Sequence, residues 1–187
     1  MNSGVAGRTI ARPASIGRRT PPSKSPDMAH LTDLWLARRG RRAALRIVRP
    51  YVERTRWRRG SDPGEAWMEP YALGFLTCLV TLVARPVMGG APGEVLGLVQ
   101  AEAWAALTGL PAGPVGECVL TLSLAQDPDF TLGMGDALLF HSAHRGSHQG
   151  WTPDGLSEQT GAQTVLDLWD SLIGVRIEAG PLRATAP

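Results

Sequence analysis

The sequence predicts a mostly α-helical protein, a single-domain bundle of five or six helices that follows a disordered N-terminal tail. Its 187 residues are enough for one compact domain with its own hydrophobic core. Long apolar or amphipathic stretches alternate with short breaks rich in glycine and proline, which is the pattern of helices separated by turns. Short connections are typical of antiparallel neighbouring helices in a bundle. These observations together favour an all-α fold.

Residues 1–27 are expected to form a disordered basic tail. They are rich in Arg, Ser, Pro and Gly and contain no acidic residue before Asp27, so they cannot bury enough apolar surface to fold alone. They lack the apolar centre of a secretory signal, although their composition is similar to that of an organelle transit peptide. Cys78 and Cys118 show no metal or redox spacing and are interpreted as core thiols in a reducing compartment. We therefore expect a cytoplasmic protein, with an organelle-targeted tail as the alternative.

Residues 28–59 are predicted to be an arginine-faced amphipathic helix or a kinked helix pair. Asp27 is a plausible N-cap, and Pro50 either kinks the helix or opens a second one that runs to about Arg59. At about 100° per residue, six arginines share roughly a third of the helix surface. The opposite side is mainly apolar and should dock on the rest of the domain. The predicted anion- or partner-binding residues are Arg38, Arg39, Arg42, Arg46, Arg49 and Arg56.

Residues 60–180 are predicted to be an all-α core domain. Helices of about 65–84 and 94–108 are apolar almost all round, so they should form its centre. The apolar run 71–84 is shorter than the roughly 20 residues that a membrane crossing needs, and no transmembrane span is expected. Three tryptophans in these helices and the last one are predicted to be core residues, namely Trp67, Trp104 and Trp169.

The second half of this domain is less clearly patterned. Helices are predicted over about 115–126 and about 129–141, and Gly146 should end the second helix before it reaches His148. A last helix is predicted to begin at Thr160 or Thr164 and to run through "TVLDLWDSLI". The alternation in "VLTLSL" also fits a short strand at 119–124. The end "IGVRIEAG" fits either a short strand at 173–178 or the terminus of a helix.

Charge divides the chain into two halves of opposite sign. Residues 1–60 hold 15 basic and 3 acidic residues, a net charge of +12, whereas residues 61–187 hold 4 basic and 14 acidic residues, a net charge of −10. Lys24 is the single lysine, so neither a phosphate-binding loop with its lysine nor a Schiff-base enzyme has a candidate residue in the folded part. Arginine is suited to carboxylate and phosphate because its planar fork donates two parallel hydrogen bonds.

The charge pattern favours a non-enzymatic interaction protein, an adaptor or accessory subunit, whose arginine face docks an acidic protein partner. A nonspecific nucleic-acid-binding protein is the alternative, because the face offers arginine without the Asn, Gln, Ser or Thr that usually accompany it in reading bases. An anionic membrane surface and neutralisation by the chain's own acidic residues remain open. The oligomeric state is not indicated.

A second alternative is a metal-dependent enzyme. His141, His144 and His148 in "HSAHRGSH" lie at i, i+3 and i+7, a spacing that can hold a transition metal if the helix continues. Histidines in the last turn of a helix also bind free carbonyls. Glu102 and Glu117 lie inside apolar helices, where Arg85 is a natural partner. We find no nucleophile elbow, assign no catalytic residue and no cofactor, and lean against an enzyme.

Overall fold

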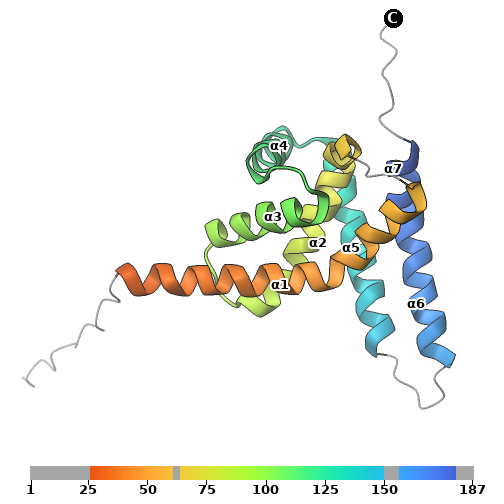
Figure 1. The fold of residues 1–187 in the computed structure, drawn as a ribbon, viewed down its shortest axis with the longest axis horizontal. Helices are drawn as coiled ribbons and strands as arrows, with labels where there is room; N and C mark the ends of the chain where they lie inside the picture. Colours follow the sequence, from red (N-terminus) through yellow and green to blue (C-terminus); the bar gives the residue numbers. More distant parts are fainter. Residues whose placement is uncertain (1–25, 61–63, 150–155, 180–187) are drawn as a thin grey trace, which may run out of the picture.

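The computed structural model describes residues 26–60, 64–149 and 156–179, and each element within these ranges is helical. The predicted all-α bundle is confirmed (Figure 1). The predicted tail 1–27 lies outside the described residues except for its last two. The elements are α1 (Pro26–Arg59), the 3₁₀ turn η1 (Gly64–Met68), α2 (Pro70–Met88), α3 (Gly93–Thr108), α4 (Ala112–Ala125), α5 (Pro128–Gln149), α6 (Leu156–Trp169), the π-helical turn η2 (Asp170–Gly174) and α7 (Val175–Ala179).

The helix predicted over about 115–126 is confirmed: residues 119–124 lie in α4, so the alternative of a strand there does not hold. The alternation in α4 arises because apolar residues occur all round the helix: Val119 packs against the core and Leu120 is exposed. Residues 173–178 lie in η2 and α7, so this end is a helix terminus and not a strand. One expectation about element boundaries is wrong. Gly146 does not end α5, which continues to Gln149. A glycine in a helix costs about 1 kcal/mol relative to alanine, and the packing of α5 on α2 offsets that cost.

Helix α1 is continuous through Pro50, so the alternative of two separate helices does not hold. Figure 1 shows that its axis changes direction in the second half. Proline removes one helical hydrogen bond and its ring crowds the carbonyl four residues earlier, which bends a helix toward the opposite side. Pro50 is exposed, so the C-terminal part of α1 is turned toward the body of the domain, where it meets η2 and α7.

Helix α2 is the centre of the bundle, as predicted, and contacts α1, α3 and α5. Twelve of its 19 residues are buried. The predicted core tryptophans Trp67, Trp104 and Trp169 are 0%, 1% and 0% exposed, which confirms them. Among the described residues, α2 alone is long and apolar enough to cross a membrane; 67% of that apolar window is buried within the fold. Length and composition alone do not separate such a helix from a core helix.

Glycines allow the central helices to approach closely. A Cβ at Gly74 of α2 would overlap the backbone of Phe130 in α5, and a Cβ at Gly133 of α5 would overlap the carbonyl of Tyr71 in α2. Gly40 of α1 is buried beneath the side chain of Met88. The absence of a side chain at these positions sets the spacing between helices, and it fixes α1 on α2 with one particular face outward.

Candidate partner-binding face

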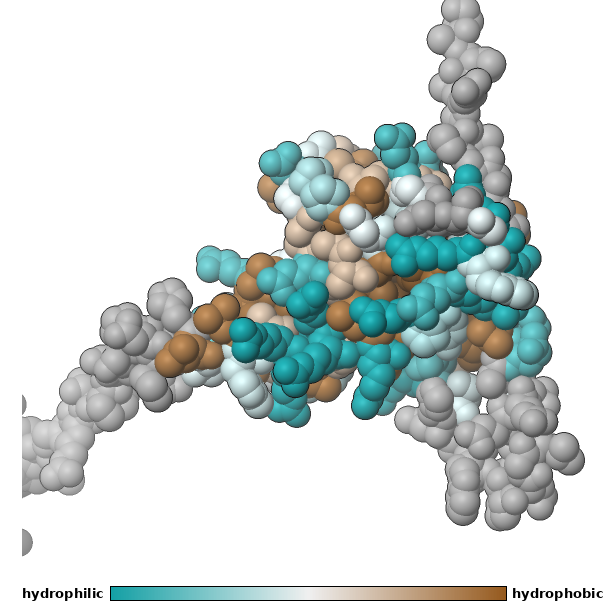
Figure 2. Space-filling model, in the orientation of Figure 1, coloured by the Kyte–Doolittle hydropathy of each residue, from teal (hydrophilic) through white to brown (hydrophobic). Residues whose placement is uncertain are grey.

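The arginines of α1 separate into two sets by the side of the helix they occupy. The outer arginines are exposed, and Figure 2 shows hydrophilic side chains gathered along the middle of α1. The inner arginines lie beside the buried stripe of the helix and reach partners elsewhere in the domain. The outer set is Arg38, Arg39, Arg42, Arg46 and Arg49, and the inner set is Arg41, Arg54, Arg58 and Arg59.

Arg56 belongs to neither set. A straight helix would place it directly in line with Arg38, which is why it was predicted to be part of the face. The structure shows Arg56 half-buried, because the bend after Pro50 turns this part of α1 toward the domain. The five other predicted arginines share one exposed side of the helix.

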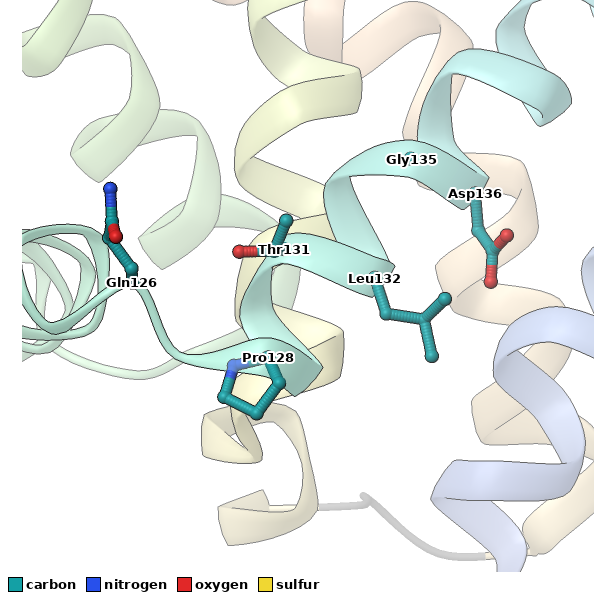
Figure 3. A pocket seen from close by; sticks show the side chains of 6 residues that line it. All are labelled: Gln126, Pro128, Thr131, Leu132, Gly135 and Asp136. Carbon is teal, nitrogen blue, oxygen red and sulfur yellow. The ribbon is translucent and has the colours of Figure 1, made fainter.

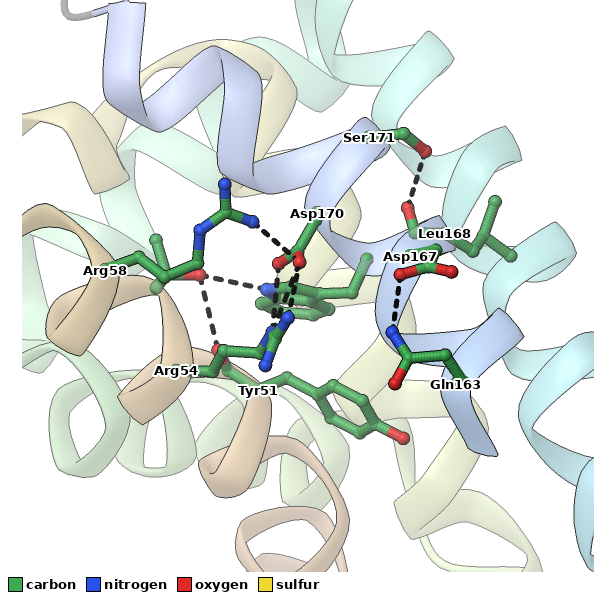
Figure 4. Close-up of polar contacts among 10 residues, drawn as sticks. Tyr51, Arg54, Arg58, Gln163, Asp167, Leu168, Asp170 and Ser171 are labelled. Carbon is green, nitrogen blue, oxygen red and sulfur yellow. Dashed lines mark hydrogen bonds and ion pairs between the residues drawn. The ribbon is translucent and has the colours of Figure 1, made fainter. Parts of the chain in front are cut away.

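The inner arginines bind partners within the chain. Arg54 is bidentate on Asp170, with Nη2 2.8 Å from Oδ2 and Nε 3.2 Å from Oδ1 (Figure 4). Arg58 Nη1 lies 2.6 Å from the same Oδ2. Arg59 donates a hydrogen bond to the carbonyl of Ile177. Arg41 lies 4.0 Å from Glu102, a longer ion pair between two half-exposed side chains.

Asp170 is the carboxylate that fixes the C-terminal part of α1. Burial raises the pKa of Asp170, but the hydrogen bonds and charges of Arg54 and Arg58 outweigh it and hold that pKa below its ordinary value. The hydrogen bond to Asp170 correspondingly raises the pKa of Arg54. Beside this ion pair, Trp169 Nε1 donates to Thr55 Oγ1 at 2.9 Å. These contacts between α1 and the junction of α6 with η2 hold the orientation of α1.

The outer arginines have much weaker partners. Within the described parts of the chain, no carboxylate lies within ion-pair distance of Arg38, Arg42 or Arg46. Arg49 lies 4.0 Å from Glu53 one turn along the same helix, with both side chains about half exposed, and such pairs contribute little. The remaining member, Arg39, lies over the ring of Trp35 at 5.3 Å and stays exposed. The five outer arginines therefore form a row from Arg38 to Arg49 whose positive surface faces solvent.

Two exposed tryptophans lie on α1 outside the outer arginines: Trp35 three residues before Arg38, and Trp57 eight residues after Arg49, beyond the bend at Pro50. Trp35 is 57% and Trp57 is 81% exposed. Trp and Arg are the residues most enriched where protein partners bind tightly. A helical projection places Trp35 on the same side of α1 as the outer arginines, whereas Trp57 follows the bend that also turns Arg56 away from them.

A cavity of about 540 Å³ adjoins the row where α1, α5 and α6 meet. The sequence did not predict it. Tyr51 lies beside it, within an aromatic cluster in which its ring is 5.1 Å from Phe140 and 5.2 Å from Trp169, and burial raises the pKa of Tyr51. A hydrogen bond of 3.0 Å joins the Tyr51 hydroxyl to Nδ1 of His144. The lining residues are Arg46, Ile47, Pro50, Tyr51, His144, Ser147, Val165 and Leu166.

Within the described residues, no group of three His, Cys, Asp or Glu side chains could hold a metal ion. His144 is bonded to Tyr51, and burial, followed by the charge of Arg145, lowers the pKa of His141. His148 is on the same helix, but its side chain lies outside the described residues. The three-histidine hypothesis stays a prediction.

Other acid–base candidates are engaged or exposed. Glu102 pairs with Arg41 and not with the expected Arg85, and Glu117 is exposed, so they are not a buried acid pair. A hollow of about 660 Å³ at the start of α5 has Asp136 at its edge (Figure 3). The Tyr71 hydroxyl donates to that carboxylate at 2.8 Å, and burial together with this hydrogen bond raises the pKa of Tyr71.

No protein-family model matches the chain, and the comparisons with curated proteins and with solved structures returned no significant match. Function is therefore argued from the geometry of α1 and its surroundings.

Proposed function

We propose that the chain is a non-enzymatic interaction protein, an adaptor or accessory subunit, whose outer arginines dock an acidic surface on a partner protein. One observation carries the proposal: the inner arginines use carboxylates and a carbonyl of the chain itself, whereas Arg38, Arg42 and Arg46 have no carboxylate in reach within the described residues. From Arg38 to Arg49 the row is about 16 Å long at 1.5 Å per residue. That length suits a protein segment.

The cost of maintaining this row supports a role in binding. Arg38 and Arg42, and again Arg42 and Arg46, are like charges one helical turn apart, and each such pair destabilises a helix by a few tenths of a kcal/mol. Carboxylates from a partner would remove that repulsion and form charge-assisted hydrogen bonds with the guanidiniums. The exposed ring of Trp35, three residues before Arg38, adds apolar contact area for the same partner.

Binding of single-stranded nucleic acid is the second candidate, and the exposed rings of Trp35 and Trp57 favour it. Aromatic rings stack on bases, and arginines neutralise phosphates. The two rings, however, stand 22 residues apart on one helix, or about 33 Å, and successive stacked bases need neighbouring rings. The acidic protein surface is therefore preferred.

A binding experiment with the full chain separates the two candidates. Fluorescence anisotropy would measure its affinity for labelled poly-L-glutamate and for mixed-sequence single- and double-stranded DNA over a range of NaCl concentrations. We expect tighter binding of poly-L-glutamate at equal salt, and at least a tenfold loss in the double variant Arg38→Gln/Arg42→Gln. The control Arg85→Gln/Arg145→Gln removes the same charge from two exposed arginines of α2 and α5 and should bind as the wild type does.

Equal losses in the two double variants would show that net charge alone controls binding and would contradict the proposal. Tighter binding to single-stranded DNA, with a steep dependence on salt from counterion release, would select the second candidate instead.

A further inference from the structure

The cavity and the row of outer arginines share one residue, Arg46, which is exposed and lines the cavity. Pro50, in the next turn of α1, lines it as well. The positive surface of α1 therefore passes directly into a hollow that α5 and α6 close on the other side. A partner that lies along the outer arginines meets this hollow.

The cavity is suited to an apolar group. Ile47, Pro50, Val165 and Leu166 form its apolar lining. The polar groups beside them have partners already: the Tyr51 hydroxyl is bonded to His144, and Ser147 Oγ donates to the carbonyl of His144 at 2.8 Å. An apolar side chain could enter without breaking these bonds. The volume, about 540 Å³, lies within the range of roughly 300–1,000 Å³ found for ligand pockets.

We propose that this cavity receives one bulky apolar side chain of the acidic partner, which binds as a helix with its carboxylates along the outer arginines. The inference rests on the proposed function and adds the chemistry of the partner. The carboxylates of such a partner complement the charge of the outer arginines. Arg38 lies about 12 Å along α1 from Arg46, so a small carboxylate held in the cavity cannot contact both, whereas a polypeptide partner can. Arg38, Arg42 and Arg46 are four residues apart, so acidic residues about one turn apart on the partner would face them in turn.

The two parts of the site have different roles. Carboxylate–guanidinium contacts attract and orient the partner, but a uniform row of arginines accepts any register along the helix. A single apolar side chain in a cavity sets that register and excludes water around it, as buried anchors do in peptide-binding grooves. Recognition would then require acidic residues and an apolar anchor at a constant offset.

A random 16-residue peptide library displayed on phage, selected against the full chain, tests this pattern. We expect enriched peptides to carry several acidic residues and one Leu, Phe or Trp at a constant position relative to them. The most enriched peptide is then synthesised and its affinity measured by anisotropy. Ile47→Trp, which fills the cavity and leaves every arginine in place, should weaken binding at least tenfold, and Arg38→Gln/Arg42→Gln should weaken it as well.

Two further variants make the result decisive. Leu166→Trp fills the cavity from α6 and replaces Ile47→Trp if that variant melts early by circular dichroism. Leu98→Trp introduces the same side chain at an exposed position on α3 and should leave binding unchanged. Acidic peptides without an apolar anchor, bound equally by the cavity-filling variants, would overturn the cavity inference and leave the proposed function standing. Recovery of no acidic peptides, or of peptides indifferent to Arg38→Gln/Arg42→Gln, would overturn both.

Discussion

Replacing Asp170 by asparagine should destabilise the fold by about 2 kcal/mol at pH 7. The carboxylate contacts two guanidiniums, those of Arg54 and Arg58, and its side chain is 16% exposed. Charge-assisted hydrogen bonds contribute about 1.5–3 kcal/mol each; the arginines are about one-third exposed, so solvent screening reduces the total. Asparagine keeps the volume and one acceptor, which leaves about 2 kcal/mol, or a fall in Tm of roughly 4–8 °C for a chain of this size.

Urea denaturation followed by circular dichroism measures this difference, with Asp167→Asn as the matched control. Asp167 is exposed and accepts a hydrogen bond from Gln163 one turn away, so its replacement should change stability by less than about 0.5 kcal/mol. Equal stability of Asp170→Asn and Asp167→Asn at pH 7 would refute the assignment of Asp170 as the residue that holds α1 in place.

The Asp170 effect should also depend on pH in a defined direction. The folded-state pKa of Asp170 is lowered, so the stabilisation is complete above the unfolded-state pKa of about 4. It shrinks as the pH falls below that value and is lost once the pH passes through the folded-state pKa. The wild type and Asp170→Asn should therefore converge in acid, and a difference that grows in acid would contradict the ion pair.

Two further pairs of variants test the helix packing and the division of the arginines. Arg42→Gln removes the repulsion between Arg42 and the arginines one turn away on either side, so the free energy of unfolding should stay unchanged or rise by up to about 0.5 kcal/mol. Arg54→Gln leaves Asp170 partly unpaired and should lower that free energy by about 1–2 kcal/mol. A loss from Arg42→Gln as large as that from Arg54→Gln would refute the division into outer and inner arginines. Gly133→Ala should destabilise by about 1–3 kcal/mol because its Cβ overlaps the Tyr71 carbonyl. Gly135 has open space around it, so Gly135→Ala should stabilise the fold by up to about 1 kcal/mol. Thermal melts in which Gly133→Ala is the more stable of the two variants would show that α2 and α5 do not cross at Gly133.

The predictions that succeeded depend on local sequence. Helical periodicity and glycine–proline breaks indicate where helices lie, and the projection of α1 alone separates the outer arginines from its apolar side. Trp67, Trp104 and Trp169 could be assigned to the core because each lies in a predicted helix of the core domain and buried aromatic residues mostly serve packing. None of these inferences requires knowledge of which helices meet.

The features that were missed depend on contacts between distant segments. Arg54 and Asp170 are 116 residues apart, and no local pattern identifies Asp170 as the acid that binds two arginines. The cavity exists because three helices meet beside the bend at Pro50. No local pattern around Gly40 indicates that in the fold it admits the side chain of Met88.

Arginine-selective labelling with phenylglyoxal, followed by mass spectrometry of the digested chain, tests the central claim most directly. The rate of modification at each position reports whether its guanidinium is free. Arg38, Arg42 and Arg46 should react rapidly in the folded chain, and Arg54, Arg58 and Arg59 should react slowly until urea unfolds it. Equal rates across both sets, or protection of Arg38, Arg42 and Arg46 in the isolated protein, would contradict a face that is left free for a partner.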